Sequence, residues 1–134
     1  MVAHAGQRLK IFDRYLEVLY PLTPGDGKNN DSIVLYGELY GKNFLFTGDL
    51  EEPGERALLA HYPSLTVDVL KVGHHGSKTS SSEPFIKAIN PSIALISCGL
   101  DNRYGHPNTE TLTTFRTYGI QTFRTDESGA IKFE

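Results

Sequence analysis

The sequence predicts an α/β layer in which helices pack on a β-sheet. Two observations lead to this prediction. Short β-rich runs alternate with segments of helical composition, and turn-forming Gly, Pro, Asn and Asp lie between them. The composition agrees, since 39% apolar and 22% charged residues among 134 are typical of a globular domain. No apolar stretch approaches the ~20 residues of a membrane-spanning helix, and no secretory leader begins the chain. We therefore expect one soluble domain over residues 1–134 with no transmembrane segment.

The first part of the chain predicts an ambiguous apolar segment, a turn-rich loop and then a hairpin. Residues 9–20 carry apolar side chains in a pattern that fits either a pair of strands or a short helix. Residues 21–31 are rich in Pro, Gly, Asn and Asp, which favour a loop. The β-rich runs 32–40 and 43–47 are joined by Gly41-Lys42, which predicts a hairpin because glycine adopts the positive φ of a two-residue turn.

The middle of the chain alternates helix and strand. A helix is predicted over residues 53–61, with a proline in its first turn, followed by a strand over residues 67–72. The run Ser80 to Ser82 is positioned to cap a helix over residues 83–89, because a serine oxygen accepts from the free N–H groups of a first turn. The Asn90-Pro91 pair ends that helix.

The last part repeats this alternation. Residues 93–97 are nearly all apolar, which is typical of a strand covered on both faces. Asn108 or Thr109 caps a helix that runs through Tyr118 and ends at Gly119. The chain ends with a predicted hairpin whose strands and turn are residues 121–124, 130–133 and 126–129.

Composition restricts the functional classes. The single cysteine, Cys98, excludes an internal disulfide framework and a multi-cysteine zinc site, so any metal must be held by histidines and carboxylates. Cys98 follows an apolar strand and is interpreted as a small buried hydrophobe. The net charge of −3 gives no overall positive field, so a nucleic-acid role would need a local site.

Polar and ionisable side chains follow three of the predicted strands. Asp49 follows the first, His74 and His75 follow the second, and the run from Asn102 to His106 follows the third. Strand ends in layered α/β folds form an edge where sites are usually built. We therefore expect Asp49, His75 and His106 to converge on one pocket, with the neighbouring glycines permitting tight turns and close approach of the backbone to a ligand.

Each of these residues also has a structural explanation. An aspartate after a strand often forms a turn, but its place beside the other loops favours a site role for Asp49. In an extended segment His74 and His75 would point to opposite sides, so that one is a ligand or proton carrier and the other is structural. Residues 79–82 favour a helix-capping run.

Further candidates lie beside the histidines. Ser77 and Lys78 are candidates for phosphate contact, and Asn102 and Arg103 supply an amide and a guanidinium for substrate binding. Ser77 stands with His74 and His75 among the catalytic candidates, although it lacks a base of known geometry and is a poor nucleophile for covalent attack.

The donor types predict which metals this site would take. Imidazole and carboxylate together suit zinc, manganese or iron(II), and such ions lower the pKa of bound water or hold a phosphate oxygen during hydrolysis. Asp49 with one or two histidines is too small a ligand set for a closed dinuclear centre. Part of such a site would have to come from elsewhere.

A set of segments carries a family resemblance. They are NNDSIVL, FLFTGDLEEPGE, VDVLKVGHHGSKTSS, PSIALISCG, NRYGHPNTETL and RTDESGAI. In order and spacing they resemble the C-terminal half of the metallo-β-lactamase-like domain of the ComEC family, the competence-related DNA-uptake channel proteins, from Asn29 to Glu134. The resemblance implies half of a metallo-β-lactamase αββα sandwich, a mixed β-sheet with helices on one face.

The same resemblance implies an activity and a ligand set. The activity is that of a metal-dependent phosphodiesterase, with Zn or Mn, thought to degrade the DNA strand that does not enter the cell. Asp49, in the TGD motif, would match the carboxylate that bridges two ions, and His75 or His106 would match the last histidine ligand. By analogy with ribonuclease Z, His75 would transfer protons and His106 would bind metal.

The chain also departs from the family pattern. The HxHxDH-type motif that supplies most ligands is absent, and Asn29 and Asn30 stand near the place of a further histidine. We therefore interpret the chain as the second half of a pseudo-symmetric domain, with residues 1–31 the remnant of a preceding sheet edge or part of the same domain. Alone, it is expected to bind metal weakly and to turn over little. The implied partners are DNA and the rest of a bacterial membrane protein, with this domain extracytoplasmic.

Two alternatives stay open at this point. The chain is either part of that nuclease, or a non-catalytic module that pairs with another chain or forms a homodimer through an exposed sheet edge. Another hydrolase of the same superfamily is a third interpretation, because the absent half would supply much of the pocket.

Overall fold

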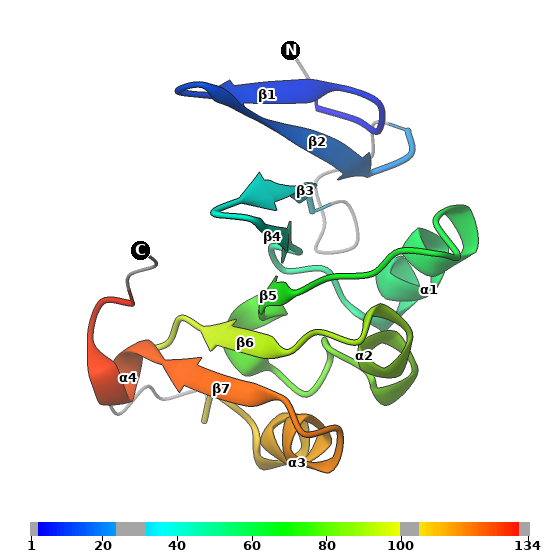
Figure 1. Cartoon of the computed structure of the whole chain (residues 1–134). Helices are drawn as coiled ribbons and strands as arrows, with labels where there is room; N and C mark the ends of the chain where they lie inside the picture. Colours follow the sequence, from blue (N-terminus) through cyan, green and yellow to red (C-terminus); the bar gives the residue numbers. More distant parts are fainter. Residues whose placement is uncertain (1–2, 24–31, 100–104, 132–134) are drawn as a thin grey trace.

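The computed structural model describes residues 3–23, 32–99 and 105–131, which form a mixed seven-stranded sheet with its strands in sequence order (Figure 1). The strands are β1 (Arg8–Ile11), β2 (Arg14–Tyr20), β3 (Val34–Leu39), β4 (Lys42–Phe46), β5 (Val69–Lys71), β6 (Ile93–Ile96) and β7 (Gln121–Arg124). Strands β1 to β4 pair antiparallel, and β4 to β7 pair parallel. The predicted α/β fold class is confirmed.

Helices connect the parallel strands. The helical elements are α1 (Glu52–His61), the 3-10 turn η2 (Gly73–Gly76), α2 (Glu83–Ile89), α3 (Thr109–Thr117) and α4 (Thr125–Ser128). Helices α1, α2 and α3 lie in the connections between successive parallel strands, and their buried side chains belong to the same core cluster as those of one face of the sheet (Figure 1). No helix among the described residues is long and apolar enough to span a membrane. Because β4, β5 and β6 are parallel, their carboxyl ends lie at the same edge of the sheet.

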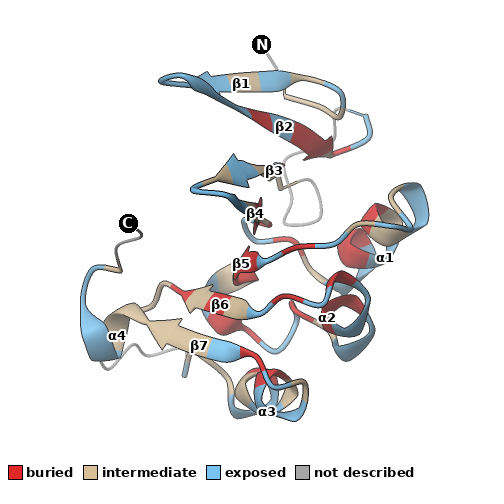
Figure 2. Ribbon diagram, in the orientation of Figure 1, coloured by how far each residue is buried: buried red, intermediate tan, exposed pale blue. Residues whose placement is uncertain are grey.

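The core lies between these helices and the sheet (Figure 2). Leu45, Leu70 and Ala94 stand in one register row across β4, β5 and β6, and all three are fully buried. Phe85 of α2 and Phe115 of α3 pack on this face. Burial of each large apolar side chain contributes about 1.5–3 kcal/mol, which fixes the helices and the loops between them.

The opposite face of the sheet is apolar but incompletely covered. Phe44 and Val69 are buried there, outside the main core cluster. Ile93, Leu95 and Phe123 on the same face are only partly buried. The expectation that residues 93–97 are covered on both faces is therefore wrong for this chain, since helices cover only the face of Ala94.

Two hairpins refine the expectations for the first part of the chain. Of the two alternatives for residues 9–20, the strand pair is the one observed. In the second hairpin Leu39 pairs with Lys42, so the turn residues are Tyr40 and Gly41 rather than Gly41 and Lys42. Both turn residues have positive φ, 54° and 75°, as a two-residue turn between twisted strands requires.

The predicted hairpin at the end of the chain is wrong. After β7 the chain enters the short helix α4, and Ala130 and Ile131 belong to no strand. Residues 132–133 lie outside the described residues. The Asp-Gly composition of residues 126–129 indicated a tight turn, but tertiary hydrogen bonds of Thr125 to the end of β6 favour a helical turn here.

A buried glutamate replaces the predicted serine cap of α2. Ser82 occupies the N-cap position, but its side chain makes no capping bond. The carboxylate of Glu55, on α1 and only 2% exposed, accepts from the N–H groups of Ser81 at 2.5 Å and Ser82 at 3.0 Å. The Ser80 hydroxyl donates to the Leu50 carbonyl instead. Glu55 thus joins the two helices that follow the Asp49 and histidine loops.

Burial raises the pKa of Glu55 above its ordinary value of 4.5, although the N–H bonds from Ser82 and Ser81 act to lower it. A raised folded-state pKa gives stability that is full below the unfolded pKa and is lost as pH rises through the folded pKa. Glu55→Gln should remove this dependence. In urea denaturation, the free energy of unfolding of the wild type should fall relative to that of this variant above about pH 4.5. The fall should be at most about 1.4 kcal/mol per pH unit. The exposed Glu38→Gln on β3 is the control, because Glu38 does not act on Glu55, and a difference that grows with pH would contradict the assignment.

Candidate functional site

The three loops singled out by the sequence lie side by side at one edge of the sheet. The His74 N–H donates to the Gly48 carbonyl at 2.9 Å, which joins the loop of Asp49 to that of the histidines. The Asn108 N–H donates to the Gly76 carbonyl at 2.8 Å, which joins the same loop to the segment of His106. Backbone hydrogen bonds therefore connect the loops after β4, β5 and β6.

Two glycines permit this close packing. A Cβ on Gly73 would lie 2.9 Å from Thr47 Oγ1, and a Cβ on Gly76 would lie 2.6 Å from Pro107 Cβ. Gly76 also has a φ of +85°, a conformation that L side chains rarely adopt. The glycines flanking the histidines are thus positions where loops from different strands touch.

The two histidines adopt a conformation that the sequence did not indicate. His74 and His75 both have left-handed backbone angles, with φ of 50° and 53°. The expectation of an extended segment, with the rings on opposite sides, is therefore wrong. A left-handed residue other than glycine costs roughly 1–2 kcal/mol, and such strain persists where surrounding contacts enforce it, often at functional sites.

His74 lies against His106. Their ring centroids are 5.8 Å apart at an interplanar angle of 71°. Partial burial, with the nearby His74 and His75, lowers the pKa of His106 below its ordinary value. The Nδ1 atom of His74 is buried and has no hydrogen-bond partner among the described residues. The buried Nδ1 of His74 is therefore a polar atom without a hydrogen bond in the described residues, close to the ring of His106.

His75 is oriented by a backbone carbonyl. Its Nδ1 lies 2.6 Å from the carbonyl oxygen of Ser97, at the end of β6. A carbonyl only accepts, so Nδ1 must carry the proton, and Nε2 of the neutral ring then carries a lone pair. His75 is an exposed residue, and Nε2 makes no hydrogen bond that would occupy this lone pair within the described residues. Metal-ligating and proton-transferring histidines share this arrangement.

Asp49 is exposed and lies within electrostatic reach of a lysine that sequence reasoning missed. Its N–H donates to Ser32 Oγ at 3.2 Å, which fixes the start of the loop. Burial lowers the pKa of Lys71, while the negative charge of Asp49 acts to raise it. The only signal in the sequence was a lysine inside the otherwise apolar end of VDVLKV.

The other predicted residues have different surroundings. Ser77 is buried, and its hydroxyl lies 3.0 Å from Thr79 Oγ1, a local turn contact. Lys78 is exposed and borders a recess of about 420 Å³ together with the carboxylates of Glu51 and Glu52, which oppose phosphate binding at that point. The roles of Ser77 and Lys78 stay predictions. Asn102 and Arg103 lie outside the described residues.

The donor set fits a divalent ion in type but not in number. An imidazole with a free Nε2, an uncompensated imidazole nitrogen and a carboxylate are ligands that zinc and manganese accept. Within residues 3–23, 32–99 and 105–131, however, no three or more His, Cys, Asp or Glu side chains are placed to hold one ion. The described part of the chain thus supplies only a portion of a ligand set.

Comparisons with known proteins agree with this picture. Residues 11–100 match the sequence profile of the metallo-beta-lactamase superfamily. The chain is 43% identical over 129 residues to ComE operon protein 3 of Bacillus subtilis, covering 96% of this chain and 17% of that protein. It is 43% identical over 117 residues to competence protein ComA of Neisseria gonorrhoeae, covering 84% of this chain and 17% of that protein. The chain therefore spans about a sixth of the length of these relatives.

Proposed function

Because the chain belongs to the metallo-beta-lactamase superfamily, we propose that it forms the C-terminal half of a metal-dependent phosphodiesterase domain, within a longer protein that acts on DNA during uptake. The names of its relatives, a ComE operon protein and a competence protein, support the link to competence. The substrate class follows from that link and from the chemistry of a metal-dependent hydrolase.

The main support for the proposal is that backbone hydrogen bonds connect the loops after β4, β5 and β6. Backbone hydrogen bonds at Gly48 and Gly76 place Asp49, His74 and His106 on adjacent turns at the edge of the sheet. The His74 and His106 rings lie against each other, and the contact of His75 Nδ1 with the Ser97 carbonyl leaves the lone pair of the neutral ring on Nε2. Such a concentration of imidazole and carboxylate groups at strand ends favours catalysis over a purely structural role.

Each residue then has a distinct task. A divalent ion bound at this edge would supply a polarised phosphate and an ionised water. Asp49 would provide the carboxylate that holds the ions, and His106 would be the metal-binding histidine. His75 Nε2, with its lone pair set by the Ser97 carbonyl, accepts the proton of the attacking water or returns one to the leaving oxygen.

The incompletely covered sheet face supports the view that this is half of a domain. Ile93, Leu95 and Phe123 remain partly exposed on a face where Phe44 and Val69 are already buried. An apolar face of this kind packs against another layer. We propose that the preceding part of the longer protein covers it and brings the remaining ligands, and that this domain sits on the extracytoplasmic side of a membrane protein.

The same face favours a second candidate function. A chain that covers this face with a second copy of itself would be a dimerising module without catalysis. Another hydrolytic activity of the superfamily is a further candidate for the complete domain. Oligomeric state and metal-dependent cleavage together separate these functions.

The test compares the 134-residue chain with a longer protein that contains the whole domain. The longer protein should cleave single-stranded DNA with Mn²⁺ or Zn²⁺, and a chelator should abolish cleavage because the ion ionises the nucleophilic water. The chain alone should cleave little and bind metal weakly. A dimer of the chain in size-exclusion chromatography, with a longer protein that neither binds metal nor cleaves DNA, would instead favour the dimerising module.

A further inference from the structure

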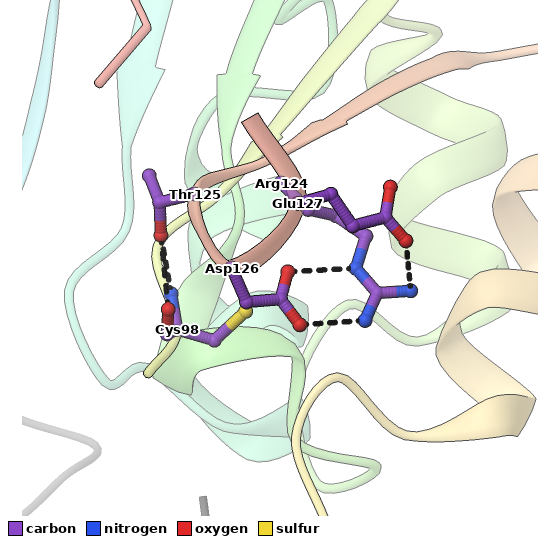
Figure 3. Close-up of polar contacts among 5 residues, drawn as sticks. All are labelled: Cys98, Arg124, Thr125, Asp126 and Glu127. Carbon is purple, nitrogen blue, oxygen red and sulfur yellow. Dashed lines mark hydrogen bonds and ion pairs between the residues drawn. The ribbon is translucent and has the colours of Figure 1, made fainter. Parts of the chain in front are cut away.

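The end of β6 is held by the segment that follows β7 (Figure 3). The Thr125 hydroxyl accepts a hydrogen bond from the Cys98 N–H at 2.9 Å and donates one to the Cys98 carbonyl at 3.0 Å. Arg124 pairs with Asp126 through hydrogen bonds of 3.0 and 2.7 Å, and with Glu127 at 3.2 Å. These pairs hold the turn of α4, so that Thr125 faces Cys98.

One peptide unit links this contact to the candidate site. The Cys98 N–H and the Ser97 carbonyl belong to the same peptide, which is planar, so the two groups point in opposite directions. Thr125 holds the N–H on one side, and the carbonyl on the other side lies 2.6 Å from His75 Nδ1. The bond to the N–H also polarises the carbonyl and makes it a better acceptor.

We propose that Thr125 is a positioning residue for His75. By fixing the rotation of the peptide between Ser97 and Cys98, its hydroxyl aims the Ser97 carbonyl at Nδ1 and so keeps the proton on Nδ1 and the lone pair on Nε2. The inference rests on the proposed function, in which His75 Nε2 moves a proton. It also gives the Arg124 and Asp126 pair a role, because that pair holds the turn from which Thr125 reaches β6.

The direct test measures the tautomer of His75 in the metal-free chain by ¹⁵N NMR of the imidazole, at about pH 8.5, where free imidazole is neutral. The wild type should show the Nδ1–H form. Thr125→Val, which removes the hydroxyl and keeps the shape, should show a mixture of both tautomers. Thr125→Ser, which keeps the hydroxyl, should restore the Nδ1–H form.

A matched control uses a threonine on β7, the strand that ends just before Thr125. The Thr122 hydroxyl makes a local contact of 3.4 Å with the Ile120 carbonyl, so Thr122→Val should leave the His75 tautomer unchanged. If the valine at position 125 prevents folding, Thr125→Ala takes its place, because it leaves room instead of adding bulk. An unchanged Nδ1–H form in a folded Thr125 variant without the hydroxyl would overturn the proposal.

A second test measures kcat and KM for DNA cleavage by the longer protein. Thr125→Val should lower kcat about tenfold, the lower end of the range for groups that orient a functional histidine, with KM unchanged and with recovery in Thr125→Ser. A rise in KM alone would overturn the proposal. The NMR result does not depend on enzymatic activity. If Thr125→Val changes the His75 tautomer but the longer protein does not cleave DNA, the role of Thr125 is supported and the proposed function is contradicted.

Discussion

Asp49→Asn in the longer protein should reduce metal-dependent DNA cleavage by about 10³-fold or more. Asparagine has almost the same shape and keeps the N–H bond to Ser32 Oγ, but it lacks the negative charge that would hold the ions in the proposed site. An ion contributes several kcal/mol of transition-state stabilisation, and about 4 kcal/mol corresponds to this loss in rate. The measurements are initial rates with Mn²⁺ and metal affinity by calorimetry.

The control for this substitution is Asp68→Asn. Asp68 is exposed at the opposite end of β5, where Oδ2 accepts from the Asn43 N–H at 2.7 Å. Its loss should cost a little stability and leave cleavage unchanged, because it lies away from the histidine loops. Full metal-dependent activity in a folded Asp49→Asn protein would remove the basis for a catalytic site at this edge.

Gly76→Ala should have the largest effect on stability. The added Cβ would lie 2.6 Å from Pro107 Cβ and 2.9 Å from Pro107 Cα, so backbone as well as side chain would have to move. A left-handed alanine costs roughly 1–2 kcal/mol, and overpacking a close contact costs about 1–3 kcal/mol more. We expect the free energy of unfolding in urea to fall by about 2–5 kcal/mol.

Gly119→Ala separates the two causes. Gly119 also has a positive φ, 67°, but a Cβ there would meet nothing within 4 Å. Only the conformational cost of roughly 1–2 kcal/mol should remain. Equal losses in the two variants would show that the close approach of Gly76 to Pro107 adds no steric cost to the substitution. In the longer protein, Gly76→Ala should also reduce cleavage, because it separates His106 from His74.

Several elements were predictable because their signals are local. Helix α2 has the bounds 83–89 expected from the serine run and the Asn90-Pro91 stop, and Asn90 adopts the left-handed conformation that ends it. Helix α3 begins at the expected cap, where the Asn108 side chain accepts from the Glu110 N–H at 2.9 Å. Turn residues and caps act within a few positions, so the sequence carries them directly.

The features that failed depend on distant partners. The cap of α2 comes from Glu55, 26 residues before Ser81, and the segment after β7 is held by bonds between Thr125 and Cys98, 27 residues apart. The sequence around Glu55 or Thr125 gives no sign of these bonds. A carboxylate or a hydroxyl can bond to any suitable group that the fold brings close to it. The left-handed His74 and His75 likewise follow from contacts of their loop with Gly48 and Asn108.

By itself the sequence determined the alternation of strands and helices, the superfamily, and the placement of Asp49, His75 and His106 after successive strands, because periodicity, turn residues and motif spacing are properties of neighbouring residues. Only the tertiary structure decided that the loops join through Gly48 and Gly76, that His74 rather than His75 touches His106, and that Ser97 sets the proton on His75. The physical reason is that a hydrogen bond or ring contact depends on distances of a few ångströms, and the packing of the core sets those distances across 22 or more residues of chain.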